Sequence, residues 1–133
     1  MNDQLAQISK PYQLTFIYRP KYLHAIVEGT EDSFEISNAY WTEIVHECKR
    51  RKLKKVLVEE RIEENVSLAE AFDVGEMNSK RDFGHAVVAF VDIYEDHDGI
   101  NEFAARVSNN RGQLIRCHES IAQAEKWLLS QDN

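Results

Sequence analysis

The chain has 133 residues and a formal net charge of −7, with 43% hydrophobic and 29% charged residues. This size and composition predict one compact domain with a single core and exclude a low-complexity or wholly disordered protein. The acidic balance repels phosphate backbones and anionic membrane surfaces, so nucleic acid is not an expected partner.

Three features of the sequence indicate a compartment. The longest apolar run, Ala86–Val91, is far shorter than the ~20 residues that span a bilayer. The first residues, Met1–Gln4, lack the basic and then apolar pattern of a signal peptide. Cys48 and Cys117 stand far apart without CxxC spacing, which indicates a reducing environment and no thiolate zinc site. We therefore expect a cytoplasmic protein of bacterial type without a transmembrane segment.

The first half of the chain predicts a hairpin, a helix and a buried strand. Residues 12–18 and 22–28 are strand-like runs separated by a short turn that contains proline. Asp32 followed by Glu35 predicts a capping box at the start of a helix. The apolar residues at helical spacing in it are Trp41, Ile44, Val45 and Cys48. Residues 56–59 then predict a short buried strand, followed by an acidic loop.

The second half alternates helices and strands. Ser67 and Glu70 form a second predicted capping box, at the start of a helix that extends towards residue 80. Residues 85–92 are the most hydrophobic stretch and are expected to form the central strand. A third helix is expected to be capped by Asp98 and ended by Gly112. Two further elements follow, a short strand over 113–117 and a final helix over 119–130.

This order of elements predicts an α/β fold with a mixed, mainly parallel five-stranded sheet, four helices and an opening β-hairpin. No linker or repeat divides the chain, so residues 1–133 are expected to form one domain.

The order of elements, together with the closing pattern of the chain, resembles the SpoIIAA-like, STAS-type domains, and the likeness covers most of the chain. The resemblance rests on the apolar strand that ends in Asp92, the helix that ends in Asn110–Gly112, and the AEKWL motif at Ala124–Leu128. It implies a non-enzymatic module that docks on a protein partner. The fold is also similar to that of the CRAL-TRIO lipid carriers, which implies an alternative use as a carrier of a small hydrophobic ligand.

Some members of the resembled family are switched by phosphorylation of a serine at the start of the helix after the third strand, and Ser67 is the matching position. Those members have Asp before the serine and Gly two residues after it, whereas this chain has Val66 and Ala69. The signature is therefore missing, and we favour the interpretation of Ser67 as a helix cap over its interpretation as a phosphorylation site.

Carboxylates are concentrated where the predicted strands end. In open parallel sheets, ligands and partners meet the carboxyl ends of the strands. The carboxylates expected at that edge are Glu59, Glu60, Glu63, Glu64, Asp92, Glu95 and Asp96. Complementarity with helix N-termini explains single acidic residues but not four glutamates in one loop. We expect this edge to dock a protein partner with a basic surface.

The remaining alternatives carry less support. A hydrophobic ligand would lie between the first helices and the sheet, and an enzyme would need a carboxylate such as Glu59 or Asp92 with a strongly raised pKa. Asp96, His97 and Asp98 are adjacent in sequence and rarely point at one metal in that arrangement. No phosphate or dinucleotide motif occurs. We therefore predict no catalytic residue, cofactor or metal, and the sequence leaves open whether the chain forms a homodimer.

Overall fold

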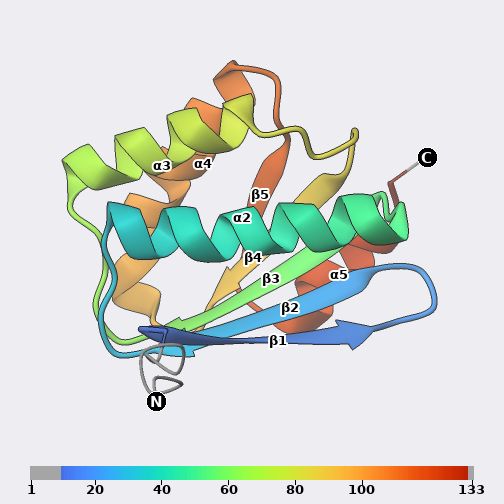
Figure 1. Ribbon diagram of the computed structural model, residues 1–133, viewed down its shortest axis with the longest axis horizontal. Coiled ribbons are helices and arrows are strands. Elements are labelled where there is room, and N and C mark those ends of the chain that lie inside the picture. The colour runs from blue at the N-terminus through green and yellow to red at the C-terminus, as the bar shows by residue number, and fades with distance from the viewer. Residues whose placement is uncertain (1–9, 132–133) are drawn as a thin grey trace, which may run out of the picture.

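A five-stranded sheet lies at the centre of the fold, with helices on both of its faces (Figure 1). The computed structural model describes residues 10–131. The strands are β1 (Tyr12–Tyr18), β2 (Leu23–Gly29), β3 (Lys55–Ile62), β4 (Val87–Asp92) and β5 (Ile115–His118). The helices are α2 (Phe34–Arg51), α3 (Leu68–Lys80), α4 (Asp98–Asn110) and α5 (Ile121–Leu129), with one short 3-10 turn, η1 (Glu95–His97), before α4.

The strands lie in the order β1-β2-β3-β4-β5. β1 is antiparallel to β2, and the other neighbours are parallel, which confirms the predicted α/β class and the opening hairpin. The prediction that residues 85–92 form the central strand is wrong. The hairpin adds two strands on one side of β3, so β3 is central. β4 also begins later than predicted, because Gly84 and His85 have φ values of 65° and 68°, outside the range of a strand.

β3 is longer than the predicted run of 56–59. It pairs with β2 as far as Ile62 and with β4 as far as Glu60. Glu60 therefore lies within the strand, beside Glu59, and not in the predicted acidic loop. Their side chains alternate between the two faces of the sheet, and each carboxylate finds a partner there. Glu59 bonds His24 at 2.9 Å, and Glu60 accepts a hydrogen bond from the Tyr40 hydroxyl.

Most of the core lies between the sheet and α2. The four residues predicted to line α2 are all buried: Trp41, Ile44, Val45 and Cys48. Trp41 stacks on Phe90 of β4 with ring centroids 6.2 Å apart. A smaller core lies on the opposite face, where Ala124 and Leu128 of α5 pack against β3 and β4. Among the helices of residues 10–131, α5 thus lies on one face of the sheet, while α2, α3 and α4 lie on the other (Figure 1).

The cap of α2 differs from the prediction by one residue. Ser33 is the N-cap, and its hydroxyl accepts a hydrogen bond from the Ile36 amide. Asp32 instead accepts hydrogen bonds from the Ser33 amide and the Ser37 hydroxyl, both at 2.8 Å. The predicted box between Asp32 and Glu35 is therefore wrong. The shift places the carboxylate of Asp32 inside the fold.

The other predicted helix ends are partly confirmed. Ser67 and Glu70 form the expected capping box of α3, with both reciprocal hydrogen bonds present. Asp98 is the first residue of α4 and not its cap, because η1 runs directly into the helix. Gly112 follows the end of α4 with a φ of 100°. α5 begins after Ser120, whose hydroxyl caps it.

The close contact between α3 and α4 depends on Gly75. A Cβ at this position would lie 2.5 Å from the Ala104 carbonyl oxygen and 2.9 Å from Val107 Cβ. We predict that Gly75→Ala lowers the free energy of unfolding by about 1–3 kcal/mol, although alanine favours helix by about 1 kcal/mol. The matched control is Gly99→Ala in α4, where nothing lies within 4 Å of the new Cβ. Equal effects of the two variants in urea denaturation would contradict this packing.

Candidate functional site

A buried polar cluster lies where the carboxyl ends of β3 and β4 meet the first turns of α2 and α4. It combines carboxylates with the hydroxyl, imidazole and amide groups that bond them. Its members are Asp32, Ser37, Tyr40, Glu60, Asp92, His97 and Asn101. Polar groups buried together in this way are stable only when hydrogen-bonded.

Glu60 is a buried carboxyl group of the cluster, with 3% of the residue exposed. Burial raises its pKa well above the ordinary value of 4.5, and the neighbouring charges of Asp32 and Asp92 raise it further. The Tyr40 hydroxyl donates to Glu60 and opposes part of this effect. Because Asp92 is also a hydrogen-bonding neighbour, a protonated Glu60 can donate to it.

His97 connects two loops of the site. Its Nδ1 lies 3.0 Å from Oδ2 of Asp92, and its Nε2 lies 3.1 Å from the backbone oxygen of Glu63. Both ring nitrogens therefore face oxygen atoms of the protein. The Asp92 carboxylate also accepts hydrogen bonds from Asn101 and from the Tyr94 amide, each at 2.9 Å. This pair holds the β3–α3 loop against the end of β4.

Asp32 lies at the opposite side of the cluster, before α2. Burial raises its pKa to about 6, while the hydrogen bonds from Ser37 and from the Ser33 amide act in the opposite direction. The charges of Glu70 and Asp92 raise it further. Asp32 and Glu60 thus share one cause for their raised pKa values, which is a low-dielectric site that holds several acids.

Glu60, Asp92 and His97 have the composition of a metal site, with one ligand atom of each within 4.8 Å of the others. Both nitrogens of His97 already bond protein oxygens, so coordination through His97 would break one of these bonds. The geometry therefore favours a hydrogen-bonded network over a metal centre. Sequence reasoning grouped His97 with Asp96 and Asp98, which are both exposed, because spacing alone does not reveal partners from other strands.

A cavity of about 50 Å³ adjoins the cluster, between α2, α3, α4 and the sheet. Asp32, Ser37, Glu60 and Asn101 supply polar groups to its wall. The apolar part of the wall includes Trp41, Val66, Ala71, Val74, Phe90, Ile100, Ala104, Ala105 and Ile115. At about 10–15 Å³ for each water-sized group, the cavity admits only a few such groups.

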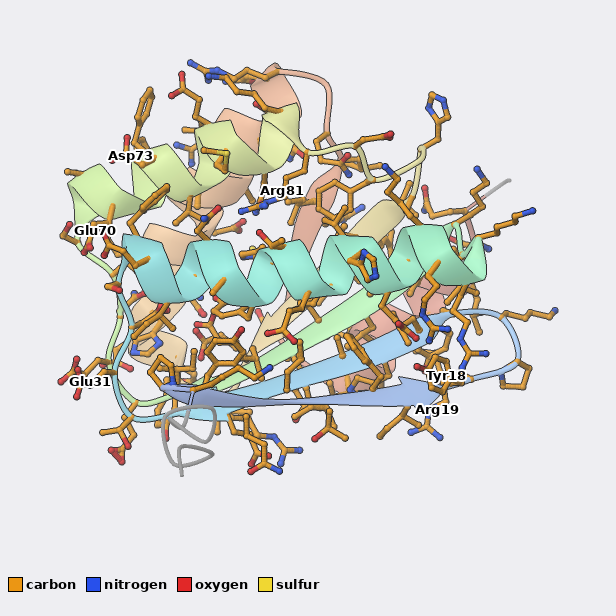
Figure 2. The ribbon with its side chains drawn as sticks, in the orientation of Figure 1. Tyr18, Arg19, Glu31, Glu70, Asp73 and Arg81 are labelled. Carbon is orange, nitrogen blue, oxygen red and sulfur yellow. The ribbon has the colours of Figure 1, made fainter. Side chains whose placement is uncertain are left out.

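Two polar contacts join the helices that border this cavity (Figure 2). Glu70 at the start of α3 accepts a hydrogen bond from the Phe34 amide at the start of α2, at 3.0 Å. Arg81 at the far end of α3 donates to the Thr42 hydroxyl at 2.9 Å and to the side chain of Asn38. These contacts hold α3 against α2 at both ends of α3.

The structure distributes the seven predicted edge carboxylates among three places. Glu63, Glu64, Glu95 and Asp96 are exposed in the two loops that His97 joins. Glu60 and Asp92 lie in the buried cluster. The exposed fraction is 3% for the whole Glu60 residue and 2% for the Asp92 side chain. Glu59 is buried on the opposite face, between His24 and Arg61. Only the four exposed residues, which we call the acidic edge, are available to a macromolecular partner.

The structure also shows the surroundings of three other residues considered in the sequence, namely Ser67, Cys48 and Cys117. Ser67 is exposed, and its hydroxyl accepts the Glu70 amide as a helix cap. Its phosphorylation stays a prediction. Burial raises the pKa of the Cys48 and Cys117 thiols to about 12, so neither is activated as a thiolate.

Comparison with known proteins bears on the fold. No protein-family model and no curated protein matches the chain. Among solved structures it is similar to an uncharacterised protein of the DUF3478 family, with a SpoIIAA-like fold, from Shewanella loihica PV-4. The two chains are 18% identical, the match covers 88% of this chain and 93% of that chain, and the TM-score is 0.53. The likeness shows that the chain has a SpoIIAA-like fold and confirms the resemblance found in the sequence. Within residues 10–131, no helix combines the length and apolarity needed to cross a membrane.

The pKa of Glu60 predicts how stability changes with pH. The folded state keeps a proton that the unfolded state releases above about pH 4.5, so this group lowers the stability of the fold as the pH rises. Glu60→Gln keeps an acceptor for Tyr40 and a donor for Asp92 without an ionisable group. We expect the variant to match the parent protein near pH 4 and to be more stable at pH 8, as measured by urea denaturation.

The matched control for this variant is Glu63→Gln, which neutralises an exposed carboxylate. Its effect should stay within about 0.5 kcal/mol at both pH values. A Glu60→Gln variant that is less stable than the parent at pH 8 would contradict a protonated Glu60.

The cap at Ser67 gives a second stability prediction. Ser67→Ala removes the acceptor for the Glu70 amide and should lower the free energy of unfolding by about 1 kcal/mol. Ser67→Asp restores an acceptor at the helix N-terminus and should recover most of this loss. Thermal denaturation of both variants tests the cap, and equal stability of Ser67→Ala and the parent would exclude it.

Proposed function

We propose that the chain is a non-catalytic, STAS-like regulatory module that docks a protein with a basic surface through the acidic edge. The observation that carries this proposal is the bond between His97 and the Glu63 backbone. It joins the β3–α3 loop to the η1 turn, so that Glu63 and Glu64 are presented together with Glu95 and Asp96. Carboxylates presented from fixed loops give a partner a defined pattern of charge.

Little positive charge lies near the acidic edge in sequence. Arg61, two residues before Glu63, pairs with Glu59 and Glu28. Residues 62–79 and 86–105 contain no lysine or arginine. Such a field attracts basic surfaces and raises the rate of encounter. The expected partner is therefore basic, and its binding should weaken as salt is added.

The buried cluster supports a structural function over a catalytic one. Raised pKa values such as those of Glu60 and Asp32 also occur in acid–base catalysts. Here a network of Tyr40, Asp92 and neighbouring groups accounts for them, and the cavity that Asp32 and Glu60 line, at about 50 Å³, is smaller than a typical substrate pocket of about 300–1,000 Å³. The same volume favours docking over carriage of a lipid, because an acyl chain would require the helices to separate.

Charge reversal tests the docking surface. In capture from a lysate of the native cell, we expect the double variant Glu63→Lys/Glu64→Lys to lose partners that the parent protein retains at low salt. The control is Asp73→Lys/Asp82→Lys, which makes the same charge change at exposed positions outside the acidic edge.

The two double variants must give different results for the proposal to stand. Equal loss in both would assign retention to net charge alone. Equal retention of the same partners by the parent protein and the Glu63→Lys/Glu64→Lys variant would refute docking through the acidic edge.

A further inference from the structure

The wall of the cavity beside α2 has an acidic part and a larger apolar part. The acidic part consists of the carboxyl groups of Asp32 and Glu60, and the rest of the wall is largely apolar and includes aromatic rings. Tyr40, Trp41 and Phe90 supply these rings. The arrangement matches that of small-molecule pockets, which combine apolar walls with a few polar groups that orient the ligand.

Positive charge is scarce at the acidic part of the wall. His97 is paired with Asp92, and its second nitrogen bonds the Glu63 backbone. Asp32 and Glu60 form no ion pair with any side chain of residues 10–131 and are held by hydroxyl and backbone donors. No lysine, arginine or histidine lies in the wall that the described residues form. The carboxyl groups therefore face the cavity without a cationic partner.

We propose that this cavity binds a compact organic cation, namely an ammonium or guanidinium group with a short apolar substituent. The cation would lie against Asp32 and Glu60, where it supplies the missing charge. The nearby aromatic rings would also stabilise it through cation–π attraction. The apolar substituent would contact the apolar part of the wall around Val74 and Ala105, and the volume limits it to a few carbon atoms.

Binding of this kind is linked to protons. Burial and neighbouring acids raise the pKa of Glu60 and bring that of Asp32 to about 6, so an arriving cation favours their ionised forms. Cation binding therefore releases protons and becomes tighter as the pH rises from 5 to 7. A neutral ligand of the same shape shows neither effect. The proposal does not depend on the docking function, because the acidic edge carries different carboxylates.

Calorimetric titration with n-propylammonium tests the proposal, with n-propanol as the neutral probe of similar size. We expect saturable binding of propylammonium with proton release and at least tenfold weaker binding of propanol. Glu60→Gln and Asp32→Asn should each weaken propylammonium binding at least tenfold. The matched control is Glu59→Gln, a buried glutamate on the other face of the sheet, with Glu63→Gln as an exposed control. Both controls should bind within twofold of the parent protein.

Several outcomes would overturn the proposal. These are equal binding of propanol and propylammonium, or unchanged binding by both Glu60→Gln and Asp32→Asn. A further arm uses a short peptide with one lysine, which carries the same ammonium group on a partner chain. Binding of the peptide without binding of free propylammonium would refute a small-molecule site. The Glu63→Lys/Glu64→Lys variant should still bind propylammonium, so failure of the docking proposal is distinguishable from failure of this one.

Discussion

The burial of Glu60 in the central strand is the constraint on which the site depends. A carboxyl group at this depth needs a proton or a partner, and its hydrogen-bonding neighbours come from α2 and β4. Tyr40 supplies a hydroxyl from α2, and Asp92 lies beside it on β4. The position of α2 over the sheet and the register of β3 with β4 are therefore coupled through one side chain.

The same network extends from the core to the surface. Asp92 holds His97, which in turn holds the backbone of Glu63, and the exposed carboxylates of the acidic edge belong to the two loops joined in this way. A change at the buried cluster would consequently be transmitted to the surface that we assign to docking. A cavity ligand that ionises Glu60 would change both the buried cluster and the acidic edge. Ligand binding in the cavity could in this way regulate docking.

The sequence predicted the layers of the fold better than it predicted the site. Alternation of apolar strands and amphipathic helices was sufficient for the fold class, and the reciprocal pattern of Ser67 and Glu70 correctly located the start of α3. Glu59 and Glu60 were misplaced because glutamate is seldom buried in a strand and the apolar run ends at Val58. The pairing of His97 with Asp92 depends on how η1 turns back over the end of β4, which sequence spacing does not encode.

The most direct test of the account is the protonation state of Glu60 itself. Side-chain ¹³C chemical shifts of the glutamate carboxyl groups, followed by NMR through a pH titration, report each group separately, and Glu60→Gln assigns the signal. The account predicts that the Glu60 carboxyl keeps its proton to a pH well above 4.5, the ordinary glutamate value, because burial and the charges of Asp32 and Asp92 raise its pKa. A Glu60 signal that titrates near pH 4.5 would contradict it.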